Sequence, residues 1–256
     1  MSYRINLNAD MAESFGAWTM GDDSALLDIV GSANLACGFH GGDPLHITRT
    51  LQAAAQRGVS VGAHPSYADL QGFGRRAMRL SDEELRALLT YQIGALQALA
   101  HINGTRVTHV KPHGALNNLA CADAHTAHLV AQTVRDIDRE LILLAPATSA
   151  LAQAGQACGL RTALEVFADR NYQADGQLVS RQDPQAMVGD ALACAAHVLR
   201  MLQAGGIVTP TGEVLHTPIH SVCVHGDGAH AVETAQTVRA AIRAVGYGLY
   251  PLTELV

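Results

Sequence analysis

The sequence predicts an α/β fold in which parallel strands close into one TIM-like barrel. Short apolar runs alternate with longer helical patterns along the 256 residues, and this alternation implies parallel strands joined by right-handed crossovers. Seven or eight such units in this length match the usual size of a closed βα barrel, about 250 residues. An open doubly wound sheet is the alternative arrangement of the same elements.

Seven apolar runs are the expected strands. No joining segment is a linker, a low-complexity stretch or an internal repeat, so we expect a single domain over residues 1–256. A hairpin-like insertion with a Thr-Gly turn is expected at 207–217. The expected strands are 4–9, 33–37, 59–63, 107–110, 141–145, 162–167 and 221–224.

The helices between these strands have recognisable start signals. Asp43 is followed by a proline, which combines an N-cap with a favoured first helical residue. Ser81 begins a capping-box pattern that a glutamate completes three residues later. Asp183, also followed by proline, predicts the start of a helix near 185–203. Further helices are expected at 23–30, 123–136, 148–157 and 229–244.

The composition excludes several classes of protein. Hydrophobic residues make up 48% and charged residues 16%, against about 25% charged in a typical globular protein, which excludes a disordered chain. The net charge of −6 argues against a general nucleic-acid binder. No apolar run approaches the roughly 20 residues that span a bilayer. A strand-like pattern from the N-terminus and five scattered cysteines without a CxxC pair predict no signal peptide and a reducing, cytoplasmic location.

Ionisable residues gather just after the expected strands. Six of the seven strand ends carry a histidine or an acid. In a parallel barrel all these positions open on the C-terminal rim, where such folds build active sites, so we expect an enzyme. The candidate catalytic residues are Asp10, Glu13, His40, His64, Lys111, His113, Glu165, Asp169, His225 and Asp227.

Some of these positions carry more weight than others. Lys111 is the one lysine beside 16 arginines, and His113 lies two residues on, so both side chains face the same side of a strand. Glu165 interrupts a buried strand, where a charge requires a partner or a ligand. His225 and Asp227 are close enough in sequence for an orienting hydrogen bond.

The expected mouth of the barrel also carries arginines. Arg75 and Arg76 lie in the long, glycine-containing loop 64–80, which we expect to act as a lid. Arg170 follows the sixth strand, where an ion pair with Asp169 is the alternative to a role in binding. These three arginines are candidates for holding a substrate carboxylate.

The sequence gives less support for a metal site or a phosphate-binding site. A metal site formed by Asp10, His40 and His113, or by another His–acid set, is possible, but no HExxH or CxxC spacing supports it. Neither GxxxxGK[ST] nor GxGxxG is present. We therefore expect no phosphate-binding loop of the chain's own.

Six blocks of sequence, taken together and in order, are specific enough to indicate a family. They resemble the LamB/YcsF family, also called the A subunit of 5-oxoprolinase. The sequence departs from the family pattern at DMAES in the first block and at HPSY in the third, but neither difference removes an ionisable group. The blocks are NLNADMAESFG (6–16), NLACGFHGGDP (34–44), VGAHPSYADLQGFGRR (61–76), HVKPHGALNN (109–118), EVFADRNY (165–172) and CVHGDG (223–228).

The resemblance implies a (β/α)7 barrel of the glycoside hydrolase/deacetylase type. It also implies a hydrolase that opens the lactam of 5-oxoproline to L-glutamate, with ATP as cosubstrate and subunits B and C as partners. ATP handling would then rest mainly with those partners. Two alternatives stay open: a metal-dependent deacetylase or carbohydrate hydrolase, and a non-catalytic subunit that organises B and C. Assembly of the chain into a homo-oligomer is also left open.

The expected chemistry assigns roles at the rim. Hydrolysis of an activated lactam needs a base, a cation near the developing negative charge and an anchor for the carboxylate. Asp10, His113 and Glu165 are the candidates for the base, and Lys111 is the expected cation. The remaining histidines are expected to act as acids or hydrogen-bonding partners, with Asp227 orienting His225.

Overall fold

Seven parallel strands form a closed barrel in the computed structural model, which describes residues 3–228 and 230–256. The last of them, β9, pairs with both β6 and β1, which confirms the barrel and excludes the open sheet. The barrel strands are β1 (Tyr3–Met11), β2 (Ser32–Ala36), β3 (Ser60–His64), β4 (Val107–Val110), β5 (Ile142–Pro146), β6 (Thr162–Phe167) and β9 (Ser221–Val224).

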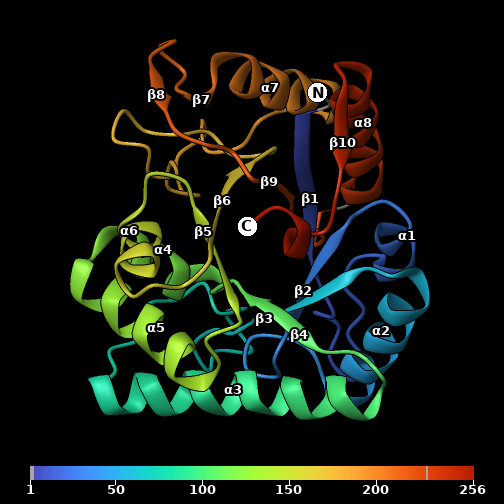
Figure 1. The fold of residues 1–256 in the computed structure, drawn as a ribbon, viewed down its shortest axis with the longest axis vertical. Helices are drawn as coiled ribbons and strands as arrows, with labels where there is room; N and C mark the ends of the chain where they lie inside the picture. The colour runs from blue at the N-terminus through green and yellow to red at the C-terminus, as the bar shows by residue number, and fades with distance from the viewer. Residues whose placement is uncertain (1–2, 229) are drawn as a thin grey trace.

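Helices cover the outside of this barrel (Figure 1). They are α1 (Asp23–Leu27), α2 (Pro44–Arg57), α3 (Asp82–Ile102), α4 (Gly114–Ala122), α5 (Ala124–Ile137), α6 (Ala150–Ala157), α7 (Ala191–Ala204) and α8 (Ala231–Ala244). The predicted insertion is an antiparallel hairpin of β7 (Gly206–Val208) and β8 (Val214–His216). Three elements were not predicted from the sequence: α4, a short 3-10 helix (Leu252–Glu254) and the short strand β10 (Tyr247–Leu249), which pairs with the start of β1.

Two of the three predicted helix starts are confirmed. Asp43 caps α2, and Ser81 and its glutamate form the complete capping box of α3. The start near 185 is wrong, because α7 begins at Ala191 under an Asp190 cap. The segment before it bonds to the loop that follows β6, through Val188 N to the Asp169 carbonyl, and so cannot form helical hydrogen bonds. The predicted start of α8 at 229 lies outside the described residues.

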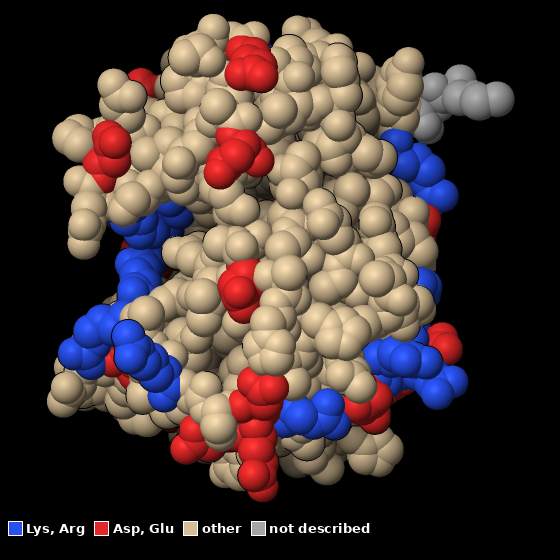
Figure 2. Space-filling model, turned by 90° about the vertical axis from the view of Figure 1, so that its left-hand side faces the viewer, with Lys and Arg blue, Asp and Glu red and all other residues tan. Residues whose placement is uncertain are grey.

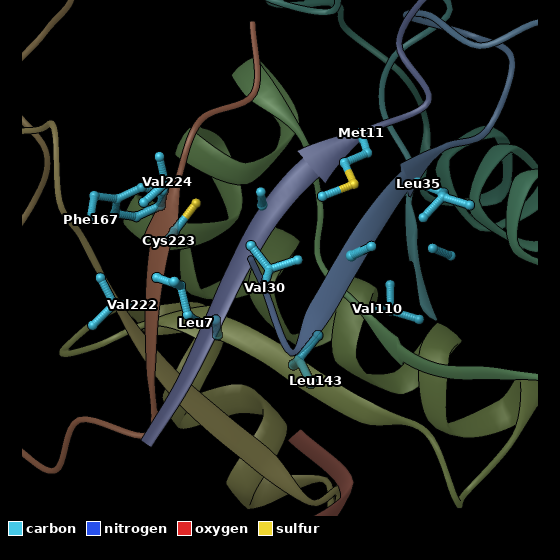
Figure 3. Packing of buried hydrophobic residues seen from close by; sticks show 14 of the residues in the cluster. Leu7, Met11, Val30, Leu35, Val110, Leu143, Phe167, Val222, Cys223 and Val224 are labelled. Atoms are coloured by element: carbon cyan, nitrogen blue, oxygen red, sulfur yellow. The ribbon is translucent and has the colours of Figure 1, made fainter. Parts of the chain in front are cut away.

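Alternation along β1 separates an apolar outer face from a polar inner one. Ile5 and Leu7 belong to the hydrophobic core between barrel and helices, and Figure 3 shows Leu7 among the other apolar side chains of this cluster. Asn6, Asn8 and Asp10 alternate with them and are also buried. The inward face therefore carries polar groups that require partners.

A hydrogen-bonded network fills the barrel interior beneath the strand ends. Asn8 donates to Ser221 Oγ over 2.7 Å and accepts from Asn34 Nδ2 over 2.8 Å. His109 Nε2 lies 2.9 Å from Asn34 Oδ1, and Asn34 also donates to Asp10 Oδ1 over 2.8 Å. This network ties the interior of the barrel to the ionisable groups at its mouth.

The opposite end of the barrel is closed by the C-terminal segment. Asn6 Nδ2 donates to the Tyr250 carbonyl over 2.8 Å. Leu252, in a short 3-10 helix (Leu252–Glu254), is buried against Ile142 and Leu144. The ionisable groups of the barrel are therefore reached from the C-terminal rim.

His197 of α7 makes the folded state sensitive to acid. Burial, assisted by Arg200, lowers the pKa of His197 to about 4, and its Nε2 donates to the Arg170 carbonyl over 3.2 Å. Because the folded pKa is below the unfolded value of about 6.5, the unfolded state binds more protons between the two, and stability is lost as the pH falls through this window. We expect the His197 contribution to fall by about 2–3 kcal/mol between about pH 7 and pH 4.5.

Denaturant unfolding of the parent and of His197→Gln across this range measures the effect. The variant retains a side-chain N–H for the carbonyl but does not titrate. Its stability should therefore fall less steeply with acid than that of the parent, and parallel curves would contradict the assignment.

Candidate functional site

Lys111 lies at the centre of the barrel mouth, just beyond the end of β4. Its Nζ lies 2.9 Å from Asp10 Oδ1, 3.3 Å from Glu165 Oε2 and 3.0 Å from Cys223 Sγ. These three partners come from β1, β6 and β9, and the ammonium group has three protons to donate to them. Lys111 therefore joins three strands across the barrel.

The pKa values in this group follow from burial and charge. Burial opposes the ionised form of Asp10, but His64 and Lys111 beside it hold its pKa well below the usual range. Burial also opposes the charge on Lys111, and Asp10 raises the pKa of the lysine above its usual value. Burial raises the pKa of Glu165, only partly countered by Lys111. Asp10 and Lys111 thus form a charged pair, while Glu165 takes up a proton more readily than an exposed glutamate.

A second buried group lies beside the first, on the loops after β1 to β4. His64 Nδ1 donates to the Lys111 carbonyl over 2.6 Å, and His113 Nε2 donates to the Phe73 carbonyl over 2.8 Å. The other nitrogens of these two rings, His64 Nε2 and His113 Nδ1, lie 3.0 Å apart. His40 stacks on His113, and its Nε2 lies 3.2 Å from Glu13 Oε1.

Four buried side chains of this group, Glu13, His40, His64 and His113, offer ligand atoms within 4.8 Å of one another. The expected metal candidates were Asp10, His40 and His113. The structure groups His40 and His113 with Glu13 and His64, and Asp10 is not part of this set. Burial raises the pKa of Glu13 and lowers those of His40 and His113. Both histidines are therefore neutral near pH 7.

The loop after β3 covers these imidazoles. Gly74 has φ +63°, and a Cβ there would overlap Ser66 Oγ and lie 2.9 Å from His40 Cβ. Its carbonyl accepts from the Ala115 backbone N–H over 2.9 Å, at the start of α4. Close approach without a side chain thus lets the loop close over the site.

A third group forms a more accessible rim. His225 Nδ1 donates to Asp169 Oδ2 over 2.8 Å, so the expectation that Asp227 orients His225 is wrong. Asp227 instead accepts from Arg75 over 2.6 Å. Gly226, between His225 and Asp227, has no room for a Cβ beside the Asp10 carbonyl, so the backbone lies against β1 and the two side chains diverge.

Two of the three arginines do not match their expected roles. Arg76 is bound by Asp69 through its Nε, 3.0 Å from Oδ1, and its side chain is largely exposed. Arg170 is buried and donates to the Val179 carbonyl over 2.6 Å, which excludes both an ion pair with Asp169 and an exposed binding role. Both guanidinium groups are committed to shaping loops. Arg75 is the member of the predicted trio that lies at the rim.

Comparison with known proteins identifies the relatives of this chain. The family model described as "LamB/YcsF family" matches residues 5–256. The chain belongs to the LamB/YcsF family. This LamB/YcsF protein is 54% identical to the 5-oxoprolinase A subunit of Azoarcus sp. (strain BH72), over 98% of both chains. It is 49% identical to the 5-oxoprolinase A subunit of Bordetella pertussis (strain Tohama I), over 97% of this chain and 99% of the relative.

Solved structures agree with the fold of this LamB/YcsF protein. The lactam utilization protein of Thermus thermophilus superimposes with a TM-score of 0.90 at 40% identity, over 96% of this chain and 99% of the other. The catalytic domain of a peptidoglycan N-acetylglucosamine deacetylase from Eubacterium rectale ATCC 33656 gives 0.53 at 14% identity, over 98% and 89%. The second likeness concerns the fold alone and confirms a barrel of the deacetylase type. In the described part of the chain, no helix has the length and apolar character to cross a membrane.

Several residues of the site were not predicted from the sequence. Arg181 lies in the loop after β6, where its Nη2 donates to His225 Nε2 over 3.4 Å. Within residues 3–228 and 230–256 it has no carboxylate at ion-pair distance. Figure 2 shows basic side chains gathered beside a hollow at one edge of the surface. Asn8 and Asn34 were not predicted either, although the alternation of polar residues along β1 signals an inward polar face.

Proposed function

We propose that this chain is the A subunit of an ATP-dependent 5-oxoprolinase, which opens the lactam of 5-oxoproline to L-glutamate together with subunits B and C. The observation that carries the proposal is the 54% identity, over 98% of both chains, to a protein named as the A subunit of 5-oxoprolinase. The name of the Thermus structure, a lactam utilization protein, supports the same substrate class. A cytoplasmic location remains a prediction.

The chemistry explains why ATP is needed. A five-membered lactam is a stabilised amide, and phosphorylation of its oxygen by ATP activates the ring carbon. Water then adds to that carbon, the C–N bond breaks as the nitrogen takes a proton, and the resulting acyl phosphate reacts with a second water to give glutamate and phosphate. This chain would bind the phosphorylated lactam, and ATP would be bound mainly by the partners.

His225 is best placed to act as the base toward water. Its Nδ1 is fixed on Asp169, so its Nε2 carries the lone pair, and among the described residues this nitrogen has one hydrogen-bond contact, the long one from Arg181. The ring lies against Phe167, with centroids 5.4 Å apart, which fixes its orientation. A histidine oriented by a carboxylate is the usual arrangement of a general base. Asp10 and Glu165 are the two buried carboxyl groups beside Lys111. Because its pKa is raised, Glu165 takes up a proton more readily than Asp10.

We assign Lys111 a different role from the one expected. Its three N–H groups point to Asp10, Glu165 and Cys223, so it positions two carboxyl groups rather than offering a free donor to the substrate. Lys111 thus holds the carboxyl groups of Asp10 and Glu165 in fixed positions at the barrel mouth. Charged groups that are already in place before the reaction are the main requirement of electrostatic catalysis.

Arg181 is the arginine that we assign to the substrate carboxylate. We expect Arg181→Gln to raise KM by about tenfold to a hundredfold, since a hydrogen bond to a charged group is worth about 1.5–3 kcal/mol, with a smaller effect on kcat. Arg76→Gln is the matched control, because Asp69 already binds that guanidinium and KM should stay near that of the parent. Equal effects of the two substitutions would contradict the assignment.

Reconstitution tests the function itself. The chain is combined with subunits B and C, 5-oxoproline and ATP, and each component is omitted in turn while glutamate is measured. We expect glutamate from the full mixture and none from the isolated chain, since no phosphate-binding loop is present in its sequence. Glutamate release by the chain alone, without ATP, would refute the partner dependence, and its absence from the full mixture would refute the function.

A further inference from the structure

One nitrogen of His64 faces one nitrogen of His113. Each ring uses its other nitrogen to donate to a backbone carbonyl, of Lys111 and of Phe73. The two nitrogens that face each other 3.0 Å apart are not used in these backbone contacts, so each is placed to offer a lone pair to a ligand. A cation between or beside the two nitrogens would bind to both rings.

Two carboxylates flank the same pair of nitrogens. Asp10 Oδ2 lies 3.4 Å from His64 Nε2, and Glu13 Oε1 lies 3.8 Å from His113 Nδ1. Ligands bound tetrahedrally at about 2.0–2.1 Å from a zinc ion are separated by roughly 3.3 Å. Three of the six separations among the four ligand atoms, 3.0, 3.4 and 3.8 Å, bracket that value. Glu13, His64 and His113 offer ligand atoms within 4.8 Å of one another, and Asp10 reaches this set through His64.

His40 has a different relation to this position. Its ring is parallel to that of His113, with an interplanar angle of 6° and centroids 3.8 Å apart. An ion in the plane of the His113 ring therefore lies outside the plane of His40, where an imidazole nitrogen has no lone pair to offer. His40 instead contacts Glu13 over 3.2 Å and orients that carboxylate, as the outer partners of metal ligands do.

We propose that His64 Nε2, His113 Nδ1, Asp10 Oδ2 and Glu13 Oε1 form a binding site for one divalent transition-metal ion. The backbone carbonyls of Lys111 and Phe73 fix the two imidazoles in the orientation and tautomer that ligation requires. Two imidazoles and two carboxylates suit zinc and its neighbours rather than magnesium or calcium, which prefer oxygen ligands alone. The proposal does not rest on the lactam chemistry, although the site shares Asp10 with the group around Lys111.

Metal titration of the full chain tests this site directly. The protein is stripped with a chelator, dialysed and titrated with Zn²⁺ by calorimetry, and the bound metal is counted by mass spectrometry after gel filtration. We expect one ion per chain and a rise in melting temperature on binding. Co²⁺ in place of Zn²⁺ should give the visible absorption of a four-coordinate site. No retained ion, together with no thermal shift, would overturn the proposal.

Variants separate this site from adventitious binding. His113→Gln and Glu13→Gln should each lose the retained ion, whereas His125→Ala, which removes an exposed histidine paired with Asp82, should keep it. Far-UV circular dichroism identifies any variant that fails to fold, and Glu13→Asp then serves as the milder change, expected to weaken binding at least about tenfold. An ion retained equally by parent, His113→Gln and Glu13→Gln would overturn the assignment. Nitrogen NMR that shows a proton shared by the two rings, unchanged after Zn²⁺ is added, would overturn it as well.

Discussion

Lys111→Arg is expected to lower the turnover of the reconstituted enzyme at least about a hundredfold. The ammonium group occupies a buried space between Asp10, Glu165 and Cys223, at 2.9 to 3.3 Å from each. A guanidinium is planar and larger, so it displaces at least one of these groups. A displacement of about 1 Å in a catalytic group costs about a hundredfold in rate, and overpacking of a buried site costs about 1–3 kcal/mol of stability.

The control is a lysine–arginine exchange where the structure imposes no such geometry. Arg86→Lys changes an exposed partner of Asp136 and should leave turnover unchanged. Turnover is measured with ATP, 5-oxoproline and saturating partners, and stability by denaturant unfolding. If Lys111→Arg turns over at the parent's rate, the close packing around the ammonium group has no part in function.

The barrel could be predicted because its signals are local. Each of the seven strands lies within two residues of its predicted bounds, since apolar runs flanked by helix caps mark them in the sequence. The start of α7 could not be predicted in this way. Asp183 and Pro184 have the residue types of a helix start, but the backbone of this segment bonds to the loop after β6, a contact that no local pattern reveals.

The sequence could predict which residues lie at the site, but not which of them contact one another. Barrel topology brings the strand ends together, so Asp10, Lys111 and Glu165 meet as expected. Which acid orients His225 depends on the path of the loop at Gly226, and the nearer residue in sequence, Asp227, is not the partner. Arg181 lies eleven residues beyond Arg170 in an irregular loop, where sequence spacing says nothing about what a side chain reaches.

A second large effect is expected on stability from breaking the buried ion pair of Asp10 and Lys111. Both side chains are at least nine-tenths buried, and each uses the other to offset its loss of hydration. Asp10→Asn leaves the lysine with Glu165, a carboxyl whose raised pKa makes it a poor counter-ion. Lys111→Met leaves two carboxyl groups without a cation. We expect each single substitution to lower the free energy of unfolding by about 3–5 kcal/mol.

The double variant distinguishes a buried pair from two independent contributions. Asp10→Asn with Lys111→Met removes both charges, so its loss should be smaller than the sum of the two single losses by about 1–3 kcal/mol. Chelator-treated protein is used throughout, because metal bound at Asp10 would add to the stability of the parent. Arg86→Gln and Asp136→Asn provide the matched cycle for an exposed pair, which should couple by less than about 1 kcal/mol. Additive losses at Asp10 and Lys111 would show that the two charges do not stabilise each other, and the positioning role of Lys111 would then have to rest on Glu165 alone.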